Sequence, residues 1–116
     1  MDRTTVKVGG KLRISGDVIA DIAEIAASEI SGVCLRDNNR LEIAVNIPFI
    51  KEFVSPVRVR VGNDAVAIDV SVIIEGGYKA YEVAKLVQEN VKSSVQNMTG
   101  IAVSKVNVSI VGIRNK

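Results

Sequence analysis

Two stretches of this 116-residue chain alternate apolar and polar residues on either side of a short turn. Residues 57–61 and 65–74 repeat with the period of two that is typical of half-buried strands, and the Gly-Asn-Asp sequence at 62–64 is a strong turn signal. Placing Val61 opposite Val66 gathers the paired valines and isoleucines on one face, whereas a slip of one residue mixes the two faces. The sequence therefore predicts an antiparallel hairpin in that register.

The same register also places Val59 opposite Ile68 and, on the outer face, Arg58 opposite Asp69. Opposite charges that face each other across two strands contribute about 0.2–1 kcal/mol. We interpret Arg58 and Asp69 as a surface ion pair that helps to set the register, in preference to a binding site.

A first helix is predicted after Ser15, whose hydroxyl can accept a hydrogen bond from a main-chain amide of the first turn. Asp17 follows in that turn, where a negative charge interacts favourably with the helix dipole. Gly32 is predicted to end this helix in a left-handed conformation. The apolar residues at helical spacing are Val18, Ile19, Ile22, Ala23, Ile25, Ala26 and Ile30.

A second helix is predicted from about Lys79 to Met98, after the strand is broken by glycines at 76–77. Gly100 is expected to cap its C-terminus. Charged residues of alternating sign line the opposite face, as on a solvated helix. The apolar stripe consists of Val83, Leu86, Val87, Val91, Val95 and Met98.

Three further segments have strand character. Residues 6–14 read as one short strand interrupted by glycine, residues 40–47 alternate cleanly, and Val106, Val108 and Ile110 mark a last strand. The expected fold class is α+β, with residues 1–116 forming a single domain. It is a two-layer sandwich in which two helices cover one face of an antiparallel or mixed sheet of about four to five strands. The order of the strands is not predicted.

Composition excludes several kinds of chemistry. The chain has no His, no Trp, one Cys and four Tyr and Phe residues, so His-based catalytic triads, His-ligated zinc and stacked aromatic platforms for nucleic acid lack their parts. The net charge of +2 is too small to indicate a polyanionic partner. A lone Cys, no signal peptide and no apolar run of about 18 residues together predict a cytoplasmic location.

No catalytic, cofactor-binding or metal-binding residue is predicted. Cys34 follows a helix C-terminus, where the dipole does not favour a thiolate, so we interpret it as a small buried hydrophobic residue. The Gly-Gly-Lys sequence at 9–11 lacks the spacing of a phosphate-binding loop. The carboxylates of Asp17, Asp21 and Glu24 are spread along one exposed helix face, which argues against paired acid–base work.

The ordered set of these motifs resembles the alkaline shock protein family, the envelope-stress proteins of Gram-positive bacteria. The resemblance covers about three-quarters of the chain and is most specific where Met-Thr-Gly is followed by Val-Asn-Val. Its main segments are Ile14-Ser15, Val18-Ile19-Ala20, Gly32-Val33, Ile68-Asp69-Val70-Ser71-Val72, Met98-Thr99-Gly100 and Val106-Asn107-Val108.

This resemblance implies a small cytoplasmic α/β domain without known catalytic residues, cofactor or small-molecule substrate. Family members are linked to alkaline and cell-wall stress, some self-associate, and some are held near the membrane by a small membrane-anchor protein. The expected function is therefore a non-enzymatic scaffold of the envelope stress response.

The resemblance lapses over residues 34–56, where a Pro-bounded segment at 48–56 holds both phenylalanines. If this segment forms a helical turn, Phe49, Ile50 and Phe53 lie close together on one side, which is the spacing of an oligomer or partner contact. The alternative is that these side chains tuck inward beneath a loop as a small satellite core.

A small nucleic-acid-binding α/β module is the alternative function. Arg58 and Arg60 on a predicted strand favour it. The near-neutral charge and the absence of aromatic residues from the predicted strands weigh against it.

Overall fold

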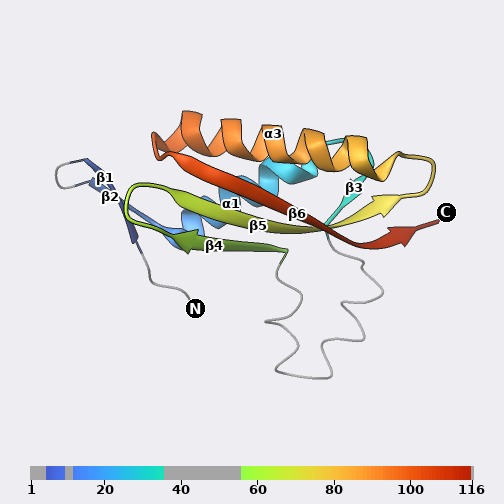
Figure 1. Cartoon of the computed structure of the whole chain (residues 1–116), viewed down its shortest axis with the longest axis horizontal. Helices are drawn as coiled ribbons and strands as arrows, with labels where there is room; N and C mark the ends of the chain where they lie inside the picture. Colours follow the sequence, from blue (N-terminus) through green and yellow to red (C-terminus); the bar gives the residue numbers. More distant parts are fainter. Residues whose placement is uncertain (1–4, 10–11, 36–55, 116) are drawn as a thin grey trace, which may run out of the picture.

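The computed structural model describes residues 5–9, 12–35 and 56–115. Within these residues the main sheet has four strands, and β5 lies at its centre (Figure 1). On one side β5 pairs antiparallel with β3 and β4, and on the other side it pairs parallel with β6. The sheet is therefore mixed. Its strands are β3 (Val33–Cys34), β4 (Val57–Val61), β5 (Val66–Glu75) and β6 (Val103–Arg114).

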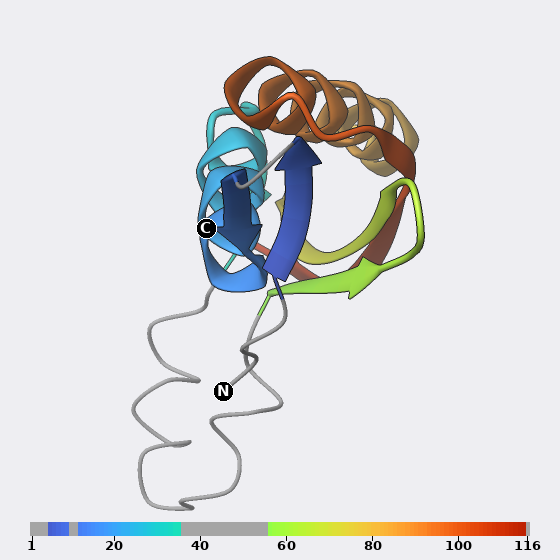
Figure 2. The same ribbon diagram turned by 90° about the vertical axis from the view of Figure 1, so that its left-hand side faces the viewer.

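Two long helices, α1 (Gly16–Ser28) and α3 (Ala80–Thr99), lie together on one face of this sheet. Figure 2 shows the sheet curving beneath them, and no helix of the described residues covers its other face. The parallel pairing of β5 with β6 requires a crossover, and α3 provides it. The predicted α+β sandwich with two helices on one face is confirmed.

A second, two-stranded sheet stands beside the start of α1. It consists of β1 (Thr5–Gly9) and β2 (Leu12–Ser15), which pair antiparallel (Figure 1). The prediction of one strand over residues 6–14 is wrong, because the chain reverses direction between Gly9 and Leu12. A Gly-Gly sequence favours a tight hairpin turn, and the prediction treated it as an interruption of one strand instead; Gly9 is the last residue of β1.

The hairpin of β4 and β5 has the predicted register. Val61 pairs with Val66, Val59 pairs with Ile68, and the pairing continues to the start of β4. Alternation places one face of β5 in the core, through Val66, Ile68, Val70, Val72 and Ile74. Buried valines, isoleucines and alanines of both helices complete that core.

The buried stripe of α3 differs from the predicted one. Val83, Val87, Val91 and Val95 are buried at a spacing of four, but Leu86 is 51% exposed and Met98 is 70% exposed. Thr99 continues the spacing of four and is buried in their place. Its hydroxyl donates to the Val95 carbonyl at 2.6 Å and accepts from the Ile101 amide at 3.1 Å, so burying this polar group leaves no bond unmade.

Small residues form the buried face of α1, where Ile19 is joined by Ala23, Ala26 and Ala27. The prediction that Val18 and Ile25 share this face is wrong, because both are exposed. The alanines allow α3 to approach closely, and the Asn90 side chain of α3 donates a hydrogen bond of 2.7 Å to the Ala26 carbonyl.

The ends of the helices test the predicted caps. Ser15 caps α1 by accepting a hydrogen bond of 3.2 Å from the Val18 amide, and Gly100 caps α3 with a φ of 75°, as predicted. The predicted end of α1 is wrong. The helix stops at Ser28, and Gly32, with a φ of 91°, serves the turn into β3 instead.

The strand predicted over residues 40–47 lies outside the described residues. So does most of the Pro-bounded segment at 48–56.

Candidate interaction surfaces

The face of the sheet away from the helices is polar and partly charged. Strands β4, β5 and β6 run side by side across it, and side chains at alternate positions of each strand point outward. Its exposed or half-buried polar residues include Arg58, Arg60, Asp69, Ser71, Lys105, Asn107 and Ser109.

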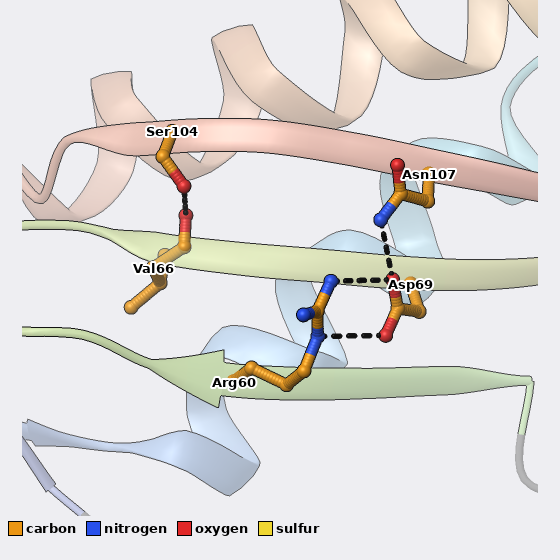
Figure 3. Close-up of polar contacts among 5 residues, drawn as sticks. All are labelled: Arg60, Val66, Asp69, Ser104 and Asn107. Atoms are coloured by element: carbon orange, nitrogen blue, oxygen red, sulfur yellow. Dashed lines mark hydrogen bonds and ion pairs between the residues drawn. The ribbon is translucent and has the colours of Figure 1, made fainter.

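Asp69 is the centre of a hydrogen-bonded cluster on this face (Figure 3). Arg60 Nε donates to Asp69 Oδ2 at 3.0 Å, and Arg60 Nη2 donates to Oδ1 at 3.1 Å. Asn107 Nδ2 donates to Oδ1 at 2.8 Å from the other side. The cluster therefore joins β4, β5 and β6, three strands that are separate in the sequence.

The predicted ion pair is wrong in its arginine. Arg58 is directly opposite Asp69 in the backbone register, as predicted, but Arg60, opposite Ala67, makes the hydrogen bonds. Side chains at diagonal positions of a twisted antiparallel pair lie within reach of a long side chain, and the arginine uses that reach.

The cluster stabilises the charged form of Asp69. The hydrogen bond from Asn107, followed by that from Arg60, lowers the pKa of Asp69 below its usual value, although partial burial opposes this change. A carboxylate with a lowered pKa whose oxygens are both engaged is a poor general base. The arrangement fits a structural clamp across the sheet.

A further side-chain hydrogen bond joins β6 to the first residue of β5. Ser104 Oγ donates to the Val66 carbonyl at 3.2 Å (Figure 3). The register between β5 and β6 shifts between Val66 and Ala67. The hydroxyl thus satisfies a carbonyl where the regular ladder is interrupted.

A group of apolar side chains is exposed where β6 ends and α3 begins. We call Tyr81, Ile110, Val111 and Ile113 the β6 patch; these residues are 79%, 41%, 52% and 65% exposed. Most monomeric proteins leave large apolar side chains exposed singly, whereas groups of them mark interaction sites. The first half of β6 differs, because Gln88 and Gln96 of α3 bond to its backbone at Val106 and Val103, each at 3.1 Å.

A shallow depression of about 380 Å³ lies on the outward side of α1. It is lined by Asp21, Glu24, Ile25, Ser28 and Leu35. Its position agrees with the sequence interpretation of the α1 carboxylates as residues of an outward helix face.

The predicted partner-contact residues Phe49, Ile50 and Phe53 lie outside the described residues, so their role stays a prediction. Cys34 lies in β3 and is half-buried. Within the described residues, no three His, Cys, Asp or Glu side chains are grouped so that they could hold a metal ion. Neither helix in that part of the chain is long and apolar enough to cross a membrane.

The model of the alkaline shock protein 23 family is described by a "cell envelope-related function" and matches residues 4–115. The chain belongs to the alkaline shock protein family. This confirms the resemblance seen in the sequence and assigns a function related to the cell envelope.

Relatives in the alkaline shock protein family come from Gram-positive bacteria. YqhY of Bacillus subtilis is 35% identical over 106 residues, covering 90% of this chain and 78% of YqhY. YloU of the same organism is 35% identical over 107 residues, covering 90% and 89%. Spy1614 of Streptococcus pyogenes is 30% identical over 120 residues, covering 95% of both chains.

Among solved structures, a MamM CTD variant is similar with a TM-score of 0.49 and 13% identity, covering 83% of this chain and 93% of that one. A second MamM CTD variant has a TM-score of 0.48 and 13% identity, covering 86% and 95%.

The β6 patch was not predicted from the sequence. The last strand was expected to alternate regularly through Ile110, yet the following residues, Val111 and Ile113, are apolar as well. Adjacent apolar residues at 110 and 111 break the alternation, and this break was the available signal.

Proposed function

We propose that this member of the alkaline shock protein family is a non-enzymatic scaffold of the envelope stress response, which acts in the cytoplasm by self-association and by contact with a membrane-anchored partner. A function related to the cell envelope follows from membership of the family. The scaffold role rests above all on the β6 patch, because grouped apolar side chains on a surface are typical of protein contacts.

The polar face of the sheet favours this proposal over nucleic-acid binding. Arg60, one of the two arginines that suggested a nucleic-acid site, has its charge offset by Asp69 in a two-point hydrogen-bonded pair. An arginine engaged in this way has fewer donors left for a phosphate.

Vesicle sedimentation tests the membrane contact. Purified chain is mixed with protein-free vesicles of the host lipids, with native inverted membrane vesicles, and with native vesicles whose exposed proteins have been removed by protease. The chain is expected to sediment only with the untreated native vesicles. Sedimentation with protein-free vesicles would show that the contact does not depend on a partner protein.

The Pro-bounded segment is a second proposed contact. Replacing Phe49 and Phe53 together by Ala removes both phenyl rings of the segment, and sedimentation with the untreated native vesicles is expected to be lost while the fold persists. Unchanged sedimentation would leave the inward-packed alternative for this segment.

A further inference from the structure

The exposed edge of β6 has a defined backbone direction. The Val66 amide donates to the Ala102 carbonyl at 3.0 Å, whereas the Ser71 amide donates to Pro56 on the other side, so the even-numbered residues at the start of β5 face β6. In a parallel pair, a residue whose N–H and C=O both bond to the neighbouring strand lies opposite a residue whose own N–H and C=O point away from that pair. Val106 is opposite Ile68, and its carbonyl indeed accepts from Gln88 rather than from β5.

The direction of the backbone groups alternates along β6. The N–H and C=O groups of Val108 and Ile110 therefore point away from β5, like those of Val106. The register then shifts near Val111, and the Gly76 amide donates to the Arg114 carbonyl at 2.8 Å. Residue 114 therefore faces β5, and its neighbour Ile113 faces outward.

Protection of this edge ends half-way along the strand. Gln88 and Gln96 satisfy the first half, but no such bond from the described residues reaches Val108, Ile110 or Ile113 on their outward side. Tyr81 lies two helical turns before Gln88 on the same side of α3, so its exposed ring flanks the uncovered half. Proteins usually guard long edges with charges, and none occurs between Lys105 and Arg114.

We propose that a second copy of this chain pairs with the uncovered half of β6, antiparallel and about a two-fold axis between residues 111 and 112. In this register Ile110 of each copy faces Ile113 of the other, so the outward peptide groups of both residues can exchange hydrogen bonds. The inference rests on the self-association in the proposed function and names its surface.

This register is self-complementary in its side chains. The isoleucine pairs form twice, and the shift near Val111 keeps them on the same face of the joined sheet. Ser109 faces Arg114 of the second copy, and Lys105 lies outside the paired segment, so no like charges are directly opposed. Arg114 already has Glu75 within 3.9 Å, which offsets its charge.

Oligomer mass tests the surface. Light scattering on the full chain, over a concentration series, is expected to give a mass of twice 12.4 kDa for the unmodified protein. Ile113→Lys places a cation opposite Ile110 in each of the two symmetry-related pairs and is expected to restore the monomer mass. Leu86→Lys is the matched control, since Leu86 is also exposed and lies one turn before Asn90, on the α1 side of α3; it is expected to keep the dimer.

A chain that stays monomeric at every concentration would overturn this surface, while the vesicle experiment above would still test the partner contact. Dimers retained by Ile113→Lys, or lost equally in Leu86→Lys, would also overturn it.

Disulfide trapping tests the register without a disruptive substitution. Ile110→Cys and Ile113→Cys are prepared separately with Cys34→Ala, so that each chain carries one thiol. Paired residues of this kind have Cα atoms about 5.5 Å apart, which suits a disulfide. A mixture of the two variants is expected to cross-link at least several-fold faster than either variant alone, and equal rates would contradict the register.

Discussion

Arg60 binds Asp69 although the backbone places Arg58 directly across from that carboxylate. The guanidinium makes two hydrogen bonds, at 3.0 and 3.1 Å, and Asn107 supplies a third at 2.8 Å. Register and side-chain pairing are thus separate properties of the hairpin, since the apolar face fixes the first and the reach of a long side chain decides the second.

Two arginine substitutions distinguish these properties. Arg60→Ala is expected to lower the free energy of unfolding by about 1 kcal/mol, because it removes a two-point pair. Arg58→Ala is expected to cost less than about 0.3 kcal/mol, because its charge acts on Asp69 without a hydrogen bond. Urea unfolding at neutral pH measures the free energy of unfolding of both variants. Equal losses would show that the hydrogen-bonded pair of Arg60 and Asp69 contributes no more than the charge of Arg58.

The pH dependence of stability reports on Asp69 separately. Its pKa is lowered in the folded state by the bond from Asn107 and then by Arg60, so near pH 4 the unfolded chain binds more protons there. The stabilisation is complete above the usual carboxyl pKa of about 3.9 and is lost as the pH falls through the lower folded value.

Asp69→Asn removes this titration. The wild type is expected to be more stable than the variant at pH 6, and the difference should shrink as the pH falls below about 4. Urea unfolding at several pH values checks this, with Asp64→Asn, an exposed turn residue, as the control. A difference that stays constant down to pH 2 would contradict the lowered pKa.

Local patterns in the sequence predicted much of this fold, and non-local relationships did not. Alternation fixed the pairing of Val61 with Val66, and a hydroxyl before an apolar repeat located the start of α1 at Ser15. The parallel pairing of β5 with β6 depends on how α3 crosses the sheet, which no local pattern records.

The interaction surfaces were less predictable for the same reason. Whether Ile113 is covered depends on where α3 begins relative to the end of β6, so its exposure follows only from the assembled layers. The predicted contact at Phe49, Ile50 and Phe53 remains a prediction, because these residues lie outside the described part of the chain.

Two neighbouring residues of α3 test which face of the helix is buried against the rest of the protein. Val87→Ala removes two methyl groups from a fully buried site and is expected to cost about 2 kcal/mol. Leu86→Ala, a larger truncation at an exposed site, is expected to change stability by less than about 0.5 kcal/mol. Denaturant unfolding measures both. A greater loss of stability from Leu86→Ala than from Val87→Ala would favour the apolar stripe predicted from the sequence, in which Leu86 is buried.

The turn between α1 and β3 requires glycine at position 32 for two reasons, and these can be tested separately. Its φ is 91°, and a Cβ there would lie 2.6 Å from Cγ of Tyr78, whose ring packs on the turn. Gly77 shares the positive φ, at 96°, but a Cβ there meets no atom within 4 Å.

Alanine at each glycine therefore separates conformational cost from steric cost. Gly77→Ala is expected to lower the free energy of unfolding by about 1 kcal/mol, which is the left-handed penalty alone. Gly32→Ala is expected to cost about 2–4 kcal/mol, because the Tyr78 ring must also move. In a Tyr78→Ala background the cost of Gly32→Ala should fall to that of Gly77→Ala, so thermal unfolding of the four-member cycle measures the steric part directly. Equal costs at the two glycines in the wild-type background would show that the ring moves aside freely.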